Sequence, residues 1–172
     1  MNLRVRGAGF RALVVALAFA SPGRLSAQEI IGLELGTVGP AAAVQTLAGQ
    51  PVDLARYVGK GPVLMEFWAT WCPNCAELEP TMKAMYAKYS SQVAFVGVAV
   101  SINQSPERVR RYVEKHELPW AQVFDKKGNA SGAYDAPATS YVVVLDKAGK
   151  VVYTGLGGKQ DLEAAIKKAL GG

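Results

Sequence analysis

The chain has 172 residues, half of them apolar, and carries 19 basic against 14 acidic side chains, for a net charge of +5 at pH 7. This length suits one ordinary domain with a sizeable core. Four of the basic residues lie in the first 27 positions, which contain no acid, so residues 28–172 are nearly neutral and their charge does not suggest nucleic-acid binding.

The first 27 residues have the three-part pattern of a secretory signal peptide. A start with three arginines is followed by the apolar run of residues 12–20, then by Ser21-Pro22-Gly23 and by small residues near Ala27. The apolar run is too short to cross a membrane, which takes about 20 residues. We therefore expect residues 1–27 to direct export and residues 28–172 to form the domain. The expected location is periplasmic or secreted, or membrane-tethered if the signal is not cleaved.

The N-terminal half of the domain predicts a hairpin, two buried strands and a long helix. In chain order these elements are a hairpin of residues 43–47 and 51–54, a strand of residues 63–68, a helix from Cys72 or Pro73 to about Tyr89, and a strand of residues 93–100. The strand of residues 63–68 is apolar except for Glu66. The helix carries apolar residues at spacings of three or four, so one of its faces is expected to pack on the sheet.

The C-terminal half continues the alternation and ends in a hairpin and a helix. In chain order these elements are a helix that starts at Ser105-Pro106 and ends near His116, a strand of residues 121–124, a helical turn of residues 129–134, strands of residues 139–145 and 150–154, and a helix of residues 160–170. The turn of residues 146–149 makes the last two strands antiparallel, whereas helices between the earlier strands imply parallel pairing. The sequence therefore predicts an α/β fold with a mixed central sheet flanked by helices.

Cys72 and Cys75 are the only cysteines in the chain and stand at the predicted junction of strand and helix. At a helix N-terminus, unpaired backbone N–H groups and the helix dipole stabilise a thiolate. A loop this short constrains little of the unfolded chain, so the pair is a poor structural staple. Structural zinc needs about four ligands, whereas the sequence offers two cysteines and one histidine. We expect Cys72 to attack a substrate disulfide and Cys75 to resolve the mixed disulfide, with no metal in the site.

Glu66 is the acidic residue of the strand that leads to the two cysteines. Burial raises the pKa of a carboxyl group, which suits a proton acceptor near neutral pH. The alternative is that Glu66 caps or pairs near the end of the strand. Pro73 and Asn74, between the cysteines, carry no positive charge that would stabilise the thiolate. The sequence therefore favours a reducing or intermediate potential over a strongly oxidising one.

The run Glu66–Cys75 resembles the signature of the thioredoxin superfamily. The segments Gly49–Leu54 and Gly59–Val63 resemble the secreted TlpA/ResA-type members, bacterial reductases of the cell envelope, many of them tied to cytochrome c maturation. The resemblance covers about residues 36–170 and implies a thioredoxin-like fold with an N-terminal hairpin extension. The chain departs from the pattern at Leu78, where these members usually carry a glutamate.

The resemblance also implies roles for single residues. Glu66 is implied to accept a proton from the resolving Cys75. Pro137 is implied to be a cis-proline whose loop faces the cysteines and pairs with the substrate. The residues expected to contact the substrate are Trp71, Pro73, Asn74, Ala136 and Pro137. For Trp71, plain packing is the alternative.

The expected function is a thiol–disulfide oxidoreductase that exchanges disulfides with protein substrates, in the reducing direction. No cofactor is expected beyond the Cys72–Cys75 pair, because the chain has no nucleotide or flavin motif. An upstream reductant in the membrane or envelope would regenerate the dithiol, and the protein is expected to be a monomer. The alternatives are a thiol peroxidase, since peroxiredoxins share this architecture, a metal-handling CxxC module, and a non-catalytic binding domain that retains the motif.

Overall fold

The structure, a computed structural model, describes Met1 and residues 32–171. Except for Met1, the predicted signal peptide of residues 1–27 lies outside the described residues. Within the described part of the chain, no helix combines the length and the apolar character needed to cross a lipid bilayer.

All of the strands and helices predicted from the sequence are present, and most differ only slightly at their ends. The strands are β1 (Ala43–Thr46), β2 (Pro51–Asp53), β3 (Val63–Trp68), β4 (Ala94–Val100), β5 (Ala121–Asp125), β6 (Tyr141–Leu145) and β7 (Val151–Leu156). The helices are the 3₁₀ turn η1 (Leu54–Arg56) and the α-helices α1 (Pro73–Tyr89), α2 (Pro106–Lys115), α3 (Asn129–Ala133) and α4 (Leu162–Gly171).

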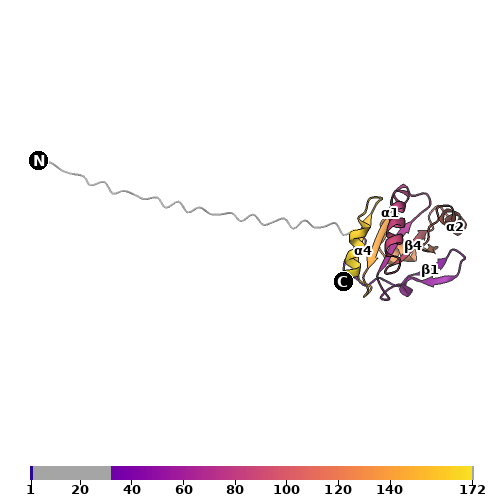
Figure 1. Cartoon of the computed structure of the whole chain (residues 1–172), viewed down its shortest axis with the longest axis horizontal. Helices are drawn as coiled ribbons and strands as arrows, with labels where there is room; N and C mark the ends of the chain where they lie inside the picture. The colour runs from indigo at the N-terminus through magenta and orange to yellow at the C-terminus, as the bar shows by residue number, and fades with distance from the viewer. Residues whose placement is uncertain (2–31, 172) are drawn as a thin grey trace.

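The strands form one mixed sheet in the order β2-β1-β5-β4-β3-β6-β7 (Figure 1). The neighbours β3 and β4 are parallel, as are β4 and β5, because α1 and α2 carry the chain back between them. The pairs β3–β6, β6–β7 and β1–β2 are antiparallel. The predicted α/β class, the mixed sheet and the N-terminal hairpin are therefore confirmed.

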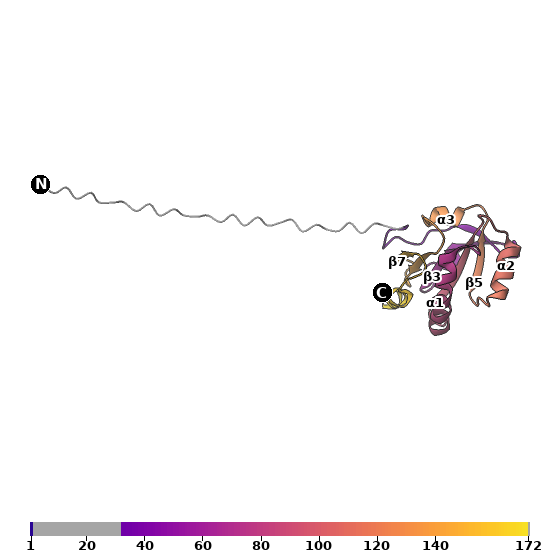
Figure 2. The same cartoon turned by 90° about the horizontal axis from the view of Figure 1, so that it is seen from above.

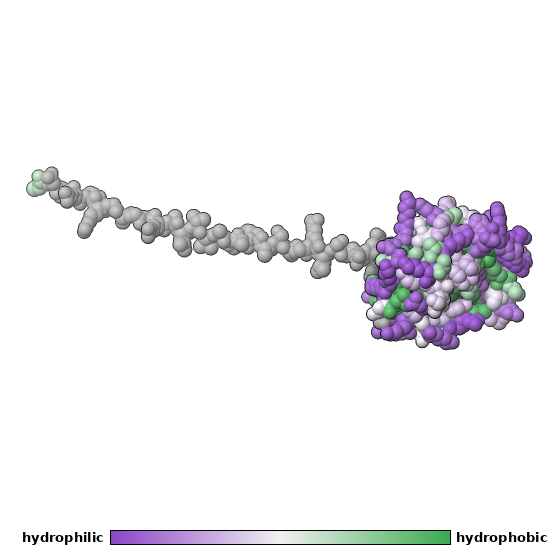
Figure 3. Space-filling model, in the orientation of Figure 1, coloured by the Kyte–Doolittle hydropathy of each residue, from purple (hydrophilic) through white to green (hydrophobic). Residues whose placement is uncertain are grey.

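Helices cover both faces of the sheet, and each face has its own core. Helices α1, α2 and α4 pack on one face, where their residues Leu78, Val109 and Ile166 are fully buried. Helix α3 and the turn η1 cover the other face, and Figure 2 shows α1 and α3 on opposite sides of the sheet. With the apolar side chains in these two cores, the face of the domain seen in Figure 3 is mainly hydrophilic.

The strand predicted for residues 139–145 begins two positions later than expected. Thr139 and Ser140 lie in a turn, and β6 starts at Tyr141. Ser140 has a φ of 68°, in the left-handed region, which is incompatible with an extended strand. Its hydroxyl donates a hydrogen bond to the carbonyl oxygen of Gly157 at 2.9 Å, so this turn is tied to the end of β7.

Candidate active site

The two cysteines lie at the start of α1, directly after the buried strand β3. Cys72 is the N-cap residue of the helix, Pro73 is its first residue, and the Cys75 N–H points at the sulfur of Cys72 at 3.1 Å. The two cysteines form a disulfide, with 5.3 Å between their Cα atoms. The predicted placement of Cys72 at a helix N-terminus is confirmed. A backbone N–H directed at this sulfur favours its thiolate when the disulfide is opened.

A second loop, residues 101–105 after β4, holds the segment that precedes α1. The side chain of Gln104 accepts a hydrogen bond from the Thr70 N–H at 2.9 Å, and Trp71 Nε1 donates one to the carbonyl oxygen of Ile102 at 2.8 Å. The side chains of Trp71 and Ile102 are nevertheless exposed, at 40% and 62%. The loop therefore fixes the position of Trp71, the residue before Cys72. The apolar side chains of Trp71 and Ile102 stay exposed.

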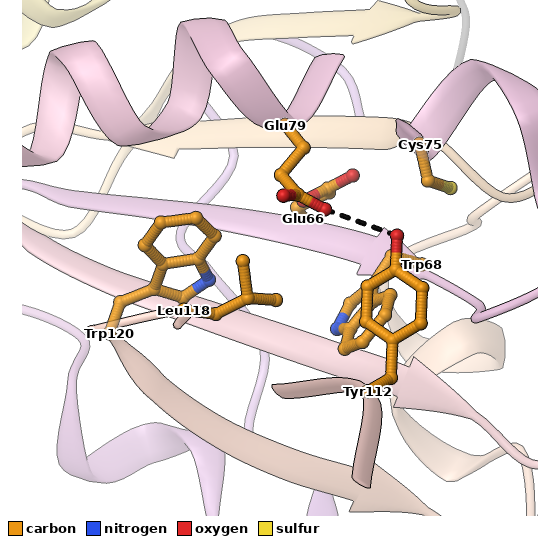
Figure 4. A pocket seen from close by; sticks show the side chains of 7 residues that line it. All are labelled: Glu66, Trp68, Cys75, Glu79, Tyr112, Leu118 and Trp120. Atoms are coloured by element: carbon orange, nitrogen blue, oxygen red, sulfur yellow. Dashed lines mark hydrogen bonds between the residues drawn. The ribbon is translucent and has the colours of Figure 1, made fainter. Parts of the chain in front are cut away.

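Glu66 lies inside the domain, beneath the disulfide. It pairs in the sheet with Gly97 of β4 and Val142 of β6, and only 5% of its surface is exposed. Its carboxyl group points into a small pocket shared with Cys75 of α1 and with Tyr112 of α2 (Figure 4). The prediction of a buried acid next to the cysteines is confirmed.

The pocket leaves about 10 Å³ for the centre of a water molecule. The residues that line it are Glu66, Trp68, Cys75, Glu79, Tyr112, Leu118 and Trp120. Burial, and then the negative charge of Glu79, raise the pKa of Glu66 to about 8. A carboxyl with this pKa can gain or lose a proton near neutral pH.

Glu79 is a site residue that the sequence did not predict. It lies four residues after Cys75 and one after Leu78, the position at which the resemblance led us to look for a glutamate. Its carboxylate accepts hydrogen bonds from Tyr112 at 3.1 Å, from His116 Nδ1 at 3.0 Å and from Lys83 at 2.9 Å. Burial alone would raise the pKa of Glu79, but these three bonds together lower it below its usual value.

His116 ends α2 as its C-cap residue, as the sequence predicts, and its ring stacks on Tyr112 with 3.8 Å between ring centroids. The contact with Glu79 brings this single histidine to the edge of the pocket. The helical spacing of α1 puts Glu79 on the side that faces α2, but the sequence alone does not tell which helices pack together. For this reason the His116–Glu79 pair could not be predicted.

The expectation of a cis bond before Pro137 is wrong. Every peptide bond in the described part of the chain is trans, including the one between Ala136 and Pro137. Most X-Pro bonds are trans, and nothing in the residues around Pro137 requires the other isomer. Pro137 is exposed and Ala136 is partly buried, in the loop between α3 and β6.

Ser140, rather than Pro137, lies beside the end of β3. Tyr141 pairs with Phe67, and the Ser140 N–H donates to the carbonyl oxygen of Phe67 at 2.8 Å. Three residues, 138–140, separate Pro137 from β6, so the proline lies farther from this strand than predicted. A proline at position 140 could not donate this hydrogen bond.

Pro73 and Asn74 are exposed on the first turn of α1. Neither side chain makes a hydrogen bond to another described residue. Within that same part of the chain, no group of three or more His, Cys, Asp or Glu side chains is placed to hold a metal ion. The arrangement therefore consists of a disulfide-bonded cysteine pair at a helix N-terminus, a buried carboxyl beneath it and an exposed apolar rim. This combination can exchange a disulfide and move the accompanying proton.

Comparison with known proteins gives relatives with the same chemistry. Residues 35–154 match the AhpC/TSA family. The thiol–disulfide oxidoreductase ResA of Bacillus thuringiensis subsp. konkukian is 30% identical over 138 residues, which cover 79% of this chain and 79% of that protein. The thioredoxin-like protein YneN of Bacillus subtilis is 29% identical over 139 residues, which cover 79% of this chain and 81% of that protein.

The fold also matches solved structures. A putative thiol:disulfide interchange protein DsbE from Chlorobium tepidum superposes with a TM-score of 0.71 at 26% identity, over 80% of this chain and 98% of that chain. A solution structure of a thiol:disulfide interchange protein from a Bacteroides species gives a TM-score of 0.69 at 25% identity, over 81% and 92%. The fold is therefore thioredoxin-like, as the resemblance implied.

Proposed function

The chain belongs to the AhpC/TSA family and is a thioredoxin-like thiol–disulfide oxidoreductase of the ResA type, and from this premise we propose that it reduces disulfide bonds in protein substrates. The observation that carries the proposal is the position of Cys72 as the N-cap residue of α1, with Glu66 buried below. The absence of positive charge at Pro73 and Asn74 supports the reducing direction, because neither residue adds to the stabilisation of the Cys72 thiolate.

The reaction begins from the dithiol form. The Cys72 thiolate attacks one sulfur of the substrate disulfide, that bond breaks, and the departing substrate thiolate takes a proton from solvent. Cys75 then loses its proton and attacks the sulfur of Cys72, which releases the second substrate thiolate and closes the Cys72–Cys75 disulfide. The substrate gains two electrons and the enzyme loses two, so a thiol reductant must return the enzyme to its dithiol form.

Glu66 is the proposed proton acceptor for Cys75. Both residues line the same pocket, and Figure 4 shows them on facing elements, β3 and α1. With a pKa raised to about 8 by burial and by the charge of Glu79, Glu66 is a stronger base than an ordinary carboxylate. An acceptor of this strength lowers the cost of forming a second thiolate inside the domain.

The proposed substrate surface surrounds Cys72. Trp71, Pro73 and Asn74 are exposed next to it. Ala136 and Pro137 belong to the loop between α3 and β6, whose last residue, Ser140, bonds to Phe67 near the end of β3. Because the apolar rim is small and partly exposed, protein substrates are expected to bind briefly, through contacts around the reacting sulfur.

The proposed location is the cell envelope or the exterior, with residues 1–27 as the export signal. Such a protein needs an upstream reductant in the membrane or envelope. The resemblance to TlpA/ResA-type reductases makes the apoproteins of c-type cytochromes the substrates to examine first, because their haem-attachment cysteines must be reduced before they react with haem.

A trapping experiment tests the proposal. The Cys75→Ala variant, expressed in the envelope of a bacterial host, is expected to accumulate mixed disulfides at Cys72, because the resolving thiol is absent. Mass spectrometry of the captured species identifies the substrates. In an insulin-reduction assay, Cys72→Ser should lose all turnover.

The matched control is the double variant Cys72→Ser, Cys75→Ala, which should capture nothing. If Cys75→Ala captures no protein and wild-type enzyme leaves insulin intact, the proposed activity is wrong. If the wild-type enzyme oxidises every protein that Cys75→Ala captures and reduces none of them, the reducing direction is wrong.

A thiol peroxidase is the second candidate, favoured by the match to the AhpC/TSA family. Peroxiredoxins typically pair their cysteine with a threonine and an arginine and lack a CxxC motif. Here no arginine lines the pocket at Cys75 among the described residues. Consumption of hydrogen peroxide by the purified enzyme, at a rate above that of Cys72→Ser, would favour this candidate.

A further inference from the structure

Two buried polar atoms in one row of the sheet lack hydrogen-bond partners among the described residues. One is Oε1 of Glu66 on β3, and the other is Nε2 of Gln122 on β5. Gly97 of β4 lies between these two residues, because it pairs in register with Glu66 on one side and with Gln122 on the other. Buried polar atoms nearly always have a partner, so an acceptor and a donor in the same row form a candidate pair.

The glycine at position 97 makes room for the side chain of Gln122. Residues paired in register point to the same face of a sheet, so Gln122 extends from the face that carries the Glu66 side chain. A Cβ atom on Gly97 would collide with Oε1 of Gln122 and would lie 2.9 Å from its Nε2. The amide group of Gln122 therefore lies over β4, one strand spacing of about 4.8 Å from β3.

Trp68 fixes which end of this amide is the donor. Its Nε1–H donates to Oε1 of Gln122 at 3.1 Å, and an indole N–H can only donate. The amide oxygen must therefore face Trp68, and the NH₂ group must take the other end. Trp68 follows Glu66 by two residues on β3, so its side chain and those of Glu66 and Gln122 lie on one face of the sheet.

The titratable groups around Glu66 offer it no positive charge. They are Cys75 and Glu79 from α1 and Tyr112 from α2, and the Tyr112 hydroxyl donates to Glu79. The proposed acceptor role nevertheless requires Glu66 to be ionised before Cys75 gives up its proton. A donor that stabilises the ionised form has to come from another side chain, and the NH₂ group of Gln122 is such a donor.

We infer that Gln122 is a positioning residue for Glu66, and that its amide N–H donates to the Glu66 carboxylate once that group is ionised. The inference rests on the proposed function, because it assigns a partner to the proposed proton acceptor. A rotation of the Glu66 side chain toward β4 makes this contact, since Gly97 has no side chain to separate the two groups. The hydrogen bond favours the charged form and so increases the share of Glu66 that can accept a proton at neutral pH.

The test removes the donor from the full-length protein and keeps the length of the side chain. The carboxyl of Glu66 is titrated by ¹³C NMR in wild type and in Gln122→Met, both with the disulfide closed, so that the cysteines do not titrate. The titration midpoint of Glu66 is expected to rise by about one pH unit, which is what a hydrogen bond to a charged group is worth. Gln50→Met, the same change at an exposed glutamine, is the matched control and should leave the midpoint unchanged.

A second variant displaces the amide without removing it. In Gly97→Ala the new methyl group collides with the flexible end of the Gln122 side chain and pushes it away from β4. The midpoint of Glu66 should rise in this variant as well. In Gln122→Ala the methyl group meets no amide, so adding Gly97→Ala to that variant should cause no further change.

The activity should follow the same change in protonation. For insulin reduction at pH 7, kcat of Gln122→Met is expected to fall by up to about tenfold with KM unchanged, because a smaller share of Glu66 is ionised. The difference from wild type should shrink toward pH 9. A folded Gln122→Met with the wild-type midpoint of Glu66 overturns the inference.

A measurement on the wild-type protein needs neither variant of Gln122 nor turnover. The ¹⁵N resonance of the Gln122 side-chain amide should shift with the midpoint of Glu66 and should stay constant over the same pH range in Glu66→Gln. An amide resonance that ignores the titration of Glu66 overturns the inference. If the resonance follows Glu66 but the wild-type enzyme has no Cys72-dependent turnover, the pairing stands and the proposed function has failed.

Discussion

Glu66 lies in a strand whose other side chains are all apolar and buried, and no described residue satisfies its Oε1. An ionised carboxyl in this place costs free energy, because burial removes its hydration. The folded state therefore holds the Glu66 proton up to a pH of about 8, whereas the unfolded chain releases it near the ordinary carboxyl pKa. Glu66 is thus a position where the proposed chemistry opposes stability.

The stability cost of Glu66 should depend on pH. Because folding raises the pKa of Glu66, the proton bound to Glu66 contributes stability at pH values below the pKa of Glu66 in the unfolded chain. This contribution is lost as the pH rises through the folded-state pKa of about 8. Glu66→Gln should therefore be more stable than wild type, and its advantage should grow by about 3 to 4 kcal/mol between pH 5 and pH 8. Urea unfolding of both oxidised proteins at pH 5, 6.5 and 8 measures this difference.

The matched control for these unfolding measurements is Glu34→Gln, the same substitution at an exposed carboxyl. It should leave the free energy of unfolding nearly constant relative to wild type across the same pH range. A pH-independent effect of Glu66→Gln would contradict the raised pKa of Glu66.

The sequence predicted the residues that are proposed to react but not the groups that surround them. One strand, one turn and the start of one helix contain Glu66, Cys72 and Cys75. Their spacing in the sequence was therefore enough to predict that they lie close together. Glu79 and His116 belong to different helices, and their contact depends on how α1 and α2 pack. No local pattern encodes that packing, and a lone histidine at a helix end is more often a capping residue.

At the scale of elements, the short helix α3 depends on a residue of the preceding strand. Its N-cap residue is Gly128, which has a φ of 73° and no side chain to cap the helix. Asp125, at the end of β5 and 1% exposed, takes this role. Its carboxylate accepts from the Ala130 N–H at 3.2 Å, the Ser131 N–H at 2.8 Å and the Ser131 hydroxyl at 2.8 Å. Helix α3 in turn begins the loop that leads to Ala136 and Pro137.

Asp125→Ala should destabilise the domain by about 2 to 3 kcal/mol, because three donors lose a charged acceptor at a buried site. Asp125→Asn keeps one carbonyl oxygen and should lose roughly half as much. Denaturant unfolding checks both values, and equal stability of Asp125→Ala and wild type would show that the cap contributes nothing.

Element boundaries followed the sequence where apolar runs end at clear turn residues, and failed where a turn has no such residue. β3 begins and ends at the predicted residues, between Pro62 and the turn before Cys72. The start of β6 was predicted two residues too early, because Thr139 and Ser140 favour strands or caps. No local sequence signal indicates the left-handed backbone of Ser140. Because β6 starts at Tyr141, Pro137 lies four residues before the strand and not the predicted two.

At the scale of the whole molecule, the direction of electron flow is coupled to folding stability. A thermodynamic cycle links the two redox states in their folded and unfolded forms, and 30 mV of potential corresponds to about 1.4 kcal/mol of stability. A reducing enzyme prefers its disulfide when folded, so we expect the oxidised protein to be more stable than the dithiol form by at least about 1.4 kcal/mol. Guanidinium unfolding with and without excess reductant measures this difference.

The opposite result has a definite meaning. A dithiol form that is more stable than the disulfide form would make the protein an oxidant and would contradict the reducing direction. The Cys72→Ser, Cys75→Ala variant is the control, because its stability should not respond to the reductant.

The two edges of the sheet are short or covered. At one edge, β2 has three residues and begins with Pro51, which has no N–H to offer to another strand. At the other edge, the start of β7 is covered by residues 36–38, where Val38 bridges Lys150 and Gly36 donates to the carbonyl oxygen of Val151 at 2.7 Å. Both features reduce the number of free backbone groups that could start amyloid-like growth at these edges. If the proposed function is right, these edges would lower the risk that the enzyme joins aggregates of an unfolded substrate protein.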